Sequence, residues 1–165
     1  VLPGVGTFNK VMNQLSETGI IDILEQNIIK NKKPFLGICI GMQILADEGF
    51  ENERCQGLGW IPGYVKKMET GDLRLPHIGW NNLIINNTSI LLNSISEEID
   101  FYFVHSYYPV PSVPEESLAI TTYGDTEFTS VLGKDNIVAC QFHPEKSGKW
   151  GLRLLDNFCK WKVGE

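Results

Sequence analysis

The most constraining feature of this sequence is a cysteine held between two glycines directly after a short apolar run. Cys39 lies between Gly37 and Gly41, and a helix-compatible segment, 42–47, follows. This order of strand, sharp turn and helix is typical of a nucleophile elbow, and the glycines suit it because side chains there would collide with the strand or the helix. We expect the helix N–H groups to lower the pKa of the Cys39 thiol. A buried structural cysteine is the alternative.

A second segment, near the C-terminus, supplies the groups that a cysteine nucleophile needs. A β-rich run, 137–142, ends at His143, and Glu145 follows two residues later. A catalytic cysteine requires an adjacent base, and the base requires a third group that fixes its tautomer. Pro144 restricts the backbone between them, so the carboxylate can turn back onto the imidazole ring. Because sites in open α/β sheets collect at the carboxyl ends of the strands, we expect Cys39 and this pair to meet there.

The composition excludes several classes of protein. The 165 residues carry a net charge of −6 and are 42% hydrophobic, which is ordinary for one globular domain and unlike a nucleic-acid-binding protein with a basic face. No apolar run approaches the roughly 20 residues of a membrane span, so no membrane partner is expected. The histidines lack metal-ligand spacing, and we expect neither a metal nor a cofactor. The scattered cysteines favour a reducing, cytoplasmic compartment over a disulfide framework.

Hydrophobic periodicity predicts alternating helices and strands. Helices are expected from Phe8 to about residue 18, from Asp22 to about residue 33, and from Lys149 to Trp161. The segment 76–81 is expected to be a connection. The expected strands are 35–38, 64–68, 83–85, 101–107, 119–123, 128–132 and 137–142. A parallel α/β half, a mostly antiparallel β segment and a closing helix predict one three-layer α/β/α domain with a mixed central sheet over residues 1–165.

The first residues read as the end of a core strand. The chain opens with Val1 rather than Met, and the stretch VLPG leads directly into a glycine loop. A parallel sheet that begins at this point is expected to have lost an earlier βαβ unit, on the order of 30 or more residues. We therefore expect the sequence to be N-terminally incomplete.

Taken together, the motifs resemble the class I, or triad, glutamine amidotransferases, and more narrowly the glutaminase subunits of imidazole glycerol phosphate synthase in histidine biosynthesis. The stretches that carry the resemblance are 2–6 (LPGVG), 37–43 (GICIGMQ), 57–59 (GLG), 76–81 (PHIGWN), 103–108 (FVHSYY) and 141–148 (QFHPEKSG). The elbow and the H-P-E tripeptide are typical of the superfamily. The stretches PHIGWN, VHSY and EKSG together narrow the resemblance to the histidine-type branch. The first strand of that family and its Gly-Asn turn are absent from this sequence.

The resemblance implies a mechanism and a set of site residues. Cys39 would attack the side-chain amide carbon of L-glutamine, His143 would take the thiol proton and return one to the departing ammonia, and Glu145 would orient His143. An N–H of the Val5–Gly6 loop and the N–H of Ile40 would hold the oxyanion. The residues implied to contact the amino-acid end of glutamine are Gln43, Glu51, the main chain near Ser106 and Tyr107, and Gly4 in the loop.

Several of these residues have a simpler interpretation. Gln43 could face solvent on the elbow helix, and Glu51 could be a solvated charge in an acidic loop. His105 lies inside a strand, which favours a structural role over a catalytic one. His77 and Trp80 are expected to pack in a loop or to contact a partner rather than to take part in the chemistry.

The resemblance also implies a partner. Ammonia released into water would be protonated and lost, so such a glutaminase works docked as a heterodimer to a (β/α)8-barrel cyclase subunit, which forms imidazole glycerol phosphate and AICAR. Three alternatives stay open. One is a paralogous glutaminase that supplies ammonia for surface-sugar biosynthesis. Another is a stand-alone hydrolase such as a γ-glutamyl hydrolase, which the Ser106–Tyr107 and EKS motifs disfavour. The third is a truncated, non-catalytic binding subunit.

Overall fold

The computed structural model, which describes residues 1–164, is built around a mixed five-stranded sheet with the strand order β1-β11-β10-β9-β6. Strand β1 pairs in parallel with β11, and the other neighbours are antiparallel. The strand bounds are Phe35–Ile38 (β1), Ile84–Ile85 (β6), Ser117–Tyr123 (β9), Thr126–Lys134 (β10) and Ile137–Cys140 (β11). Every residue of β1 and β11 is buried, as the apolar runs predicted for strands covered on both faces.

Two smaller sheets stand beside the five-stranded one. The four-stranded sheet has the order β3-β2-β4-β8, and β5 pairs with β7 in a two-stranded sheet. Their bounds are Glu48–Gly49 (β2), Cys55–Gln56 (β3), Gly63–Lys67 (β4), His77–Asn82 (β5), Asp100–His105 (β7) and Tyr107–Pro111 (β8). Because β7 and β8 are separated by one residue, the chain passes directly from one small sheet to the other at Ser106.

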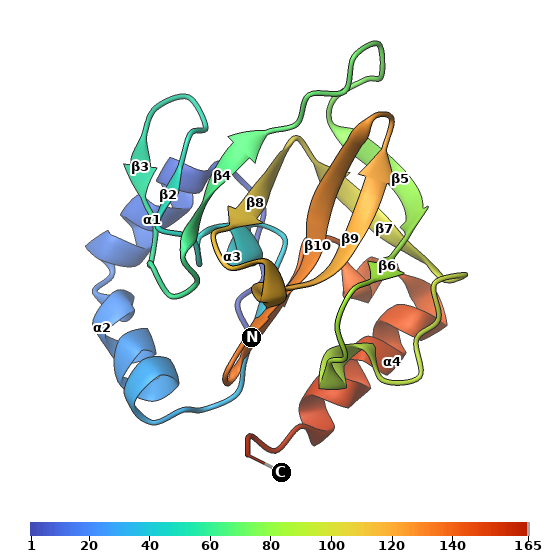
Figure 1. Cartoon of the computed structure of the whole chain (residues 1–165). Helices are drawn as coiled ribbons and strands as arrows, with labels where there is room; N and C mark the ends of the chain where they lie inside the picture. The colour runs from blue at the N-terminus through green and yellow to red at the C-terminus, as the bar shows by residue number, and fades with distance from the viewer. Residues whose placement is uncertain (165) are drawn as a thin grey trace.

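Helices flank the strands on two sides. Figure 1 shows α1 and α2 together at one flank and α4 at the other, with the strands between them, which is the three-layer arrangement that the sequence predicted. The helix bounds are Phe8–Glu17 (α1), Ile20–Leu24 (α2), Ile40–Gln43 (α3) and Gly148–Lys160 (α4). A π-helix, η1 (Glu25–Lys30), continues α2, and three single turns are η2 (Ile90–Leu92), η3 (Pro114–Glu116) and η4 (Pro144–Lys146).

The amphipathic helices pack as their apolar spacing predicted. In α1, Phe8 and Met12 are buried, one turn apart on the same face. In α4, Leu154 is fully buried, and Leu155 and Phe158 pack half-buried against the same hydrophobic cluster. This cluster joins α4 to the central sheet, so helix and sheet share one core.

Two of the sequence predictions for strands are wrong. The segment expected to be a connection, 76–81, contains β5, which pairs with β7 in the register His77↔His105 to Asn82↔Asp100. Its proline and glycine are typical of a loop, but pairing with an aromatic strand outweighs that local preference. The single strand expected over 101–107 is interrupted at Ser106, because the Ser106 carbonyl accepts from Met68 N–H at 2.9 Å and the chain changes its pairing partner there.

The predicted helices also differ in detail. The helix after Cys39 begins at Ile40 rather than at residue 42 and ends at Gln43, because the carbonyls of residues 44–46 accept hydrogen bonds from the loop 58–61 instead of from a further helical turn. The second helix begins at Ile20 and becomes a π-helix. There the Asn27 side chain donates to the Ile23 carbonyl at 2.8 Å, which competes with the main chain for that acceptor.

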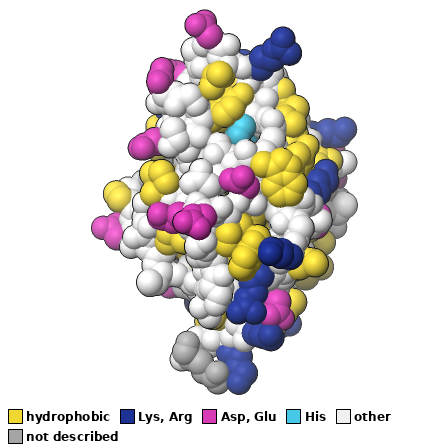
Figure 2. Space-filling view, turned by 90° about the vertical axis from the view of Figure 1, so that its right-hand side faces the viewer, with side chains coloured by type: hydrophobic (Ala, Val, Ile, Leu, Met, Phe, Trp, Pro, Cys, Tyr) yellow, Lys and Arg dark blue, Asp and Glu magenta, His cyan; other side chains and the backbone are white. Residues whose placement is uncertain are grey.

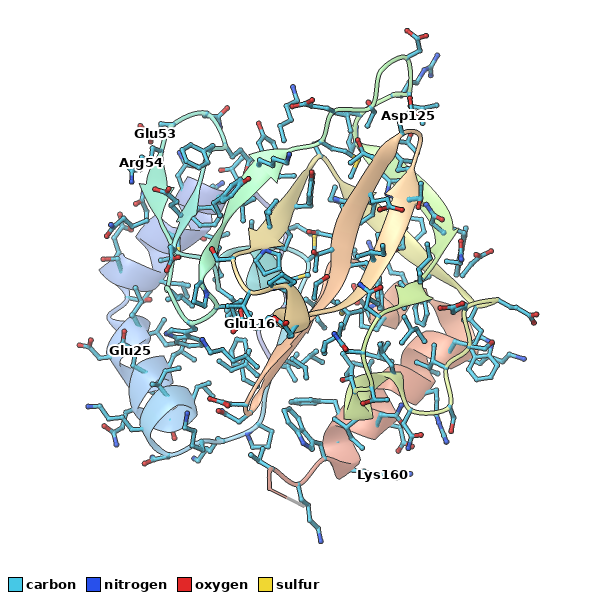
Figure 3. The ribbon with its side chains drawn as sticks, viewed as in Figure 1. Glu25, Glu53, Arg54, Glu116, Asp125 and Lys160 are labelled. Atoms are coloured by element: carbon cyan, nitrogen blue, oxygen red, sulfur yellow. The ribbon has the colours of Figure 1, made fainter. Side chains whose placement is uncertain are left out.

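Charged side chains lie mainly on the outer surface. Figure 3 shows Glu53 and Arg54 pointing outward beside β3 and Lys160 at the C-terminal end of α4. Arg54 pairs with Glu48, and Lys160 pairs with Asp156 one helical turn away. Exposed pairs of this kind contribute little to stability. Across residues 1–164, no helix combines the length and the apolar character needed to cross a bilayer.

Candidate active site

Cys39 sits on a strained turn between β1 and α3, as the sequence predicted. Its backbone has φ 54° and ψ −110°, a conformation that is rare for a residue with a side chain. A Cβ atom at Gly37 would lie 2.5 Å from the Gly41 carbonyl oxygen, and one at Gly41 would lie 2.0 Å from the Leu2 carbonyl oxygen. Only glycine therefore allows the strand, the turn and the first residues of the chain to approach so closely.

The parallel pairing of β1 with β11 brings the two predicted motifs to the same edge of the sheet. Ile38 is opposite Cys140, and the Cys39 N–H donates to the Cys140 carbonyl at 2.8 Å. The residues after Cys140 therefore leave the sheet beside Cys39. His143, at the start of η4, is 3% exposed, and its Nδ1 lies 2.7 Å from Oε1 of Glu145.

The contact with Glu145 determines which nitrogen of His143 can act as a base. A carboxylate accepts a hydrogen bond, so Nδ1 carries the proton and Nε2 presents its lone pair. Within the described residues, the buried Nε2 has no hydrogen-bond partner, and no hydrogen bond joins it to the Cys39 sulfur. A buried nitrogen without a partner costs free energy, so this position of His143 calls for an explanation other than stability.

Gln141 is a site residue that the sequence reasoning missed. Its Nε2 donates to the Cys39 sulfur at 3.6 Å, and its Oε1 accepts from Gln43 Nε2 at 3.0 Å. Gln141 is fully buried. Gln141 belongs to the stretch 141–148, but its place beside Cys39 follows from the parallel register of β1 with β11, in which Ile38 is opposite Cys140.

The expected lowering of the Cys39 pKa is wrong. Burial, together with the negative charge of Glu145, raises the pKa of the Cys39 thiol to about 11. The Ile40 N–H at the start of α3 lowers the pKa, but this effect is smaller than that of burial. Cys39 is therefore a neutral thiol at neutral pH, and nucleophilic attack requires a base that removes its proton.

A cavity of about 290 Å³ opens beside Cys39, a size that suits a small molecule. The predicted site residues that line it are Val5, Gly6, Cys39, Ile40, Gln43, Glu51, Ser106 and Tyr107, and they are joined by Pro76, Val104 and His105. His143 and Glu145 are not among the lining residues. Gly4 packs behind the wall, where a Cβ atom would lie 2.9 Å from Ile40 Cγ2.

Two predicted substrate contacts have partners inside the protein. Gln43 is buried, which rules out the solvent-facing interpretation, and its Nε2 also donates to the Tyr107 carbonyl at 2.9 Å. Glu51 is not a free solvated charge, since its Oε2 accepts from the Phe8 N–H at 2.8 Å at the start of α1. Glu51 thus caps α1 while it lines the cavity. Among residues 1–164, no group of three His, Cys, Asp or Glu side chains could hold a metal ion.

Comparison with known proteins identifies relatives along almost the whole chain. The family model of class I glutamine amidotransferases matches residues 1–161. Imidazole glycerol phosphate synthase subunit HisH 1 of Campylobacter jejuni (strain 81-176) is 47% identical over 161 residues, which cover 97% of this chain and 79% of that protein. Subunit HisH of Desulfitobacterium hafniense (strain DCB-2) is 48% identical over 162 residues, covering 98% and 75% of the two chains.

Solved structures support the fold. A crystal structure of a glutamine amidotransferase superimposes with a TM-score of 0.65 at 20% identity, over 95% of this chain and 77% of the other. A glutamine amidotransferase from Thermotoga maritima superimposes with a TM-score of 0.62 at 18% identity, over 96% of this chain and 58% of the other. The family model matches almost the whole chain, and these two HisH relatives are 47–48% identical to it. The chain therefore belongs to the class I glutamine amidotransferases, in the HisH family of imidazole glycerol phosphate synthase subunits.

Proposed function

We propose that this chain is the glutaminase subunit of an imidazole glycerol phosphate synthase in histidine biosynthesis. It hydrolyses L-glutamine to glutamate and delivers ammonia to a (β/α)8-barrel cyclase subunit in a cytoplasmic heterodimer. The observation that carries the proposal is the placement of Cys39, which lines a small cavity while the His143–Glu145 pair stands behind it at the same sheet edge. The names of the relatives favour this route over the surface-sugar alternative.

The catalytic sequence follows from the neutral thiol and the free ring nitrogen. His143 Nε2 takes the proton of Cys39 as the sulfur attacks the amide carbon of glutamine, and the carbonyl oxygen becomes an oxyanion. The oxyanion collapses, His143 gives its proton to the amide nitrogen, and ammonia leaves behind a thioester. Water then attacks the thioester with His143 again as base, and glutamate leaves as the thiol is restored. Glu145 stabilises the imidazolium at both stages.

Two rearrangements accompany this chemistry. The sulfur must exchange its hydrogen bond from Gln141 for contact with His143 Nε2. The oxyanion needs donors, and we assign them to the Ile40 N–H and to an N–H of the Val5–Gly6 loop, both at the cavity wall. Donors held in place before the reaction are the largest single source of acceleration in acyl transfer.

The partner would dock on the exposed apolar side chains near the triad. Ile78 and Trp80 on β5 are 58% and 57% exposed, and the Trp80 ring packs edge-on against Tyr102 at 5.9 Å. The Tyr102 carbonyl in turn accepts from the His143 N–H at 2.9 Å. Figure 2 shows the side of the molecule on which β5 and α4 lie. Hydrophobic side chains are exposed there, with acidic side chains mainly to the left and basic side chains mainly to the right. A mixed apolar and charged surface of this kind suits a protein partner.

The test measures glutamate release and ammonia use separately. Cys39→Ala should abolish glutamate release by the complex with its cyclase partner, while synthesis from added ammonium salt continues. Cys159→Ala, which removes an exposed thiol at the end of α4, is the matched control and should retain both activities. Glutaminase activity that persists in Cys39→Ala would refute the proposed function.

A further inference from the structure

Two buried histidines outside the proposed triad face one another across β5 and β7. His77 and His105 are opposite residues in the register of these strands, and they are 3% and 6% exposed. Their rings approach so that His77 Nδ1 lies 3.2 Å from His105 Nε2. His105 lines the cavity, whereas His77 does not. Buried polar side chains of this kind cost free energy unless each is fully hydrogen-bonded.

The hydrogen bonds around the two rings determine both tautomers. The Tyr107 carbonyl can only accept, so His105 Nδ1, at 2.9 Å, carries a proton and His105 Nε2 accepts. His77 Nδ1 must therefore donate to His105, which leaves His77 Nε2 as an acceptor for Asn81 Nδ2 at 3.4 Å. The same amide nitrogen donates to the Thr122 carbonyl at 2.9 Å, which orients the Asn81 side chain.

The hydrogen bonds from Asn81 through His77 and His105 to the Tyr107 carbonyl form a directed chain of side chains, and neither histidine has to change its protonation state for this chain to form. Burial lowers the pKa of His77 to about 4 and that of His105 to about 3, so both rings are neutral at physiological pH. Every ring nitrogen in the chain has one partner of the right kind, and the direction of all bonds runs from Asn81 toward Tyr107. Because both rings are neutral and every hydrogen bond has one direction, these side chains hold the Tyr107 carbonyl in place and carry no exchangeable charge.

The chain ends on the main chain at the cavity. The Tyr107 carbonyl accepts from Gln43 Nε2 as well as from His105 Nδ1, each at 2.9 Å. The preceding carbonyl, that of Ser106, points to the opposite edge, where Met68 N–H donates to it. Because the N–H and C=O of one strand residue share an edge, the Tyr107 N–H is directed to the same side as its carbonyl, toward the cavity that Tyr107 lines.

We propose that His77 and His105 are positioning residues, which hold the Tyr107 main chain in place so that its N–H can bind the anionic amino-acid end of the substrate. This inference rests on the proposed glutaminase function and assigns to the two histidines the affinity for glutamine rather than the chemistry at Cys39. His77 acts at one remove, through the ring of His105. Neither residue transfers a proton during the reaction.

The decisive experiment compares two substitutions of His77 that separate hydrogen bonding from packing. The His77 ring stacks on Tyr123 at 4.1 Å and on Phe103 at 5.1 Å between centroids. His77→Phe keeps the stacked ring and removes the donor to His105, whereas His77→Asn keeps a donor near the Nδ1 position and removes the ring. Tyr123→Phe is the control, because the Tyr123 hydroxyl donates to the Arg74 carbonyl and takes no part in the hydrogen bonds that link Asn81, His77, His105 and Tyr107.

The variants are assayed for glutamate release in the complex with the cyclase partner, where wild-type turnover first tests the proposed function by itself. We expect His77→Phe and His105→Phe to raise KM for glutamine at least about tenfold with kcat changed less than about threefold, and His77→Asn and Tyr123→Phe to keep KM within about threefold. A wild-type KM in His77→Phe, or a raised KM in His77→Asn alone, would refute the positioning role while leaving the glutaminase assignment intact.

A second measurement needs no variant and covers the case in which a substitution prevents folding. Two-bond 15N–1H correlation spectra report the tautomer of each histidine at pH 7. The proposal requires both His77 and His105 to be neutral with the proton on Nδ1. An Nε2 proton or a charged ring at either position would overturn the directed chain.

Discussion

Replacing Ser147 with alanine should move the His143 ring without altering the ring itself, and so should show how much the proposed catalysis depends on the position of His143. Ser147 is 3% exposed, and its hydroxyl donates to the His143 carbonyl at 2.7 Å. The same oxygen accepts from the Tyr102 N–H at 3.0 Å. Since His143 N–H also donates to the Tyr102 carbonyl, the serine completes a two-sided attachment of the proposed base, His143, to β7. Ser147→Ala removes one side of it.

The expected cost follows from these bonds. The His143 carbonyl keeps the Lys146 N–H as a donor at 3.0 Å, so its loss is one hydrogen bond of about 1 kcal/mol. The Tyr102 N–H loses its acceptor in a partly buried position, which adds about 1–2 kcal/mol. The free energy of unfolding should fall by about 2–3 kcal/mol, which corresponds to roughly 5–10 °C in Tm for a domain of this size.

In free energy, the effect on activity should be comparable to the effect on stability. A base displaced by about 1 Å can lose a factor of about 100 in rate, so we expect kcat to fall roughly 10–100-fold. KM for glutamine should change little, because Ser147 does not line the cavity. The assay is glutamate release together with thermal unfolding of the same samples.

The matched control is Ser130→Ala. Ser130 is equally inaccessible, on β10, but its hydroxyl has no hydrogen-bond partner. Its removal should leave kcat unchanged and lower stability less. If Ser147→Ala melts and turns over like Ser130→Ala, the reasoning that this hydroxyl positions His143 is wrong.

Three further results are expected. Burial raises the pKa of the Cys39 thiol from 9.0 to about 11, so the rate of its alkylation by iodoacetamide should increase as the pH rises toward 11. The free energy of unfolding should fall between pH 9 and pH 11, because the thiol ionises at lower pH in the unfolded chain than in the folded one. An alkylation rate that is flat above about pH 8 would contradict this. Gly41→Ala should place a methyl group 2.0 Å from the Leu2 carbonyl and lower Tm steeply, and an unchanged melting curve would show that the turn relaxes. Glu51→Ala should cost about 1 kcal/mol in urea unfolding because the Phe8 N–H loses its cap, whereas no loss would leave Glu51 with a role in the cavity alone.

The local motifs could be predicted from the sequence because they depend on steric and chemical constraints between residues that are close along the chain. The spacing Gly37–Cys39–Gly41 requires a turn that only glycine permits on both sides, and the structure confirms it. The carboxylate two residues after His143 reaches Nδ1 across the single turn η4, which begins at Pro144. Apolar runs such as 35–38 likewise predicted strands buried on both faces.

Other features depended on partners that are distant in sequence. The segment 76–81 has the composition of a loop, and it forms β5 only because β7 pairs with it. The direction of the Cys39 pKa shift depended on how deeply the turn is buried, which no local motif reveals. The sequence left Gln43 between solvent and substrate, and its burial against Tyr107 and Gln141 excludes the solvent-facing interpretation.

The sequence by itself determined the glycine-flanked turn at Cys39, and it indicated Cys39 as a candidate nucleophile with two candidate partners, since these follow from steric limits and side-chain types within a few residues. Only the tertiary structure decided what surrounds them. The parallel register of β1 with β11 places Gln141 against the sulfur, and the pairing of β5 with β7 directs two neutral histidines toward the Tyr107 carbonyl. The physical reason is that hydrogen-bond direction and burial are properties of groups brought together across the fold, and a linear sequence contains the groups without their distances.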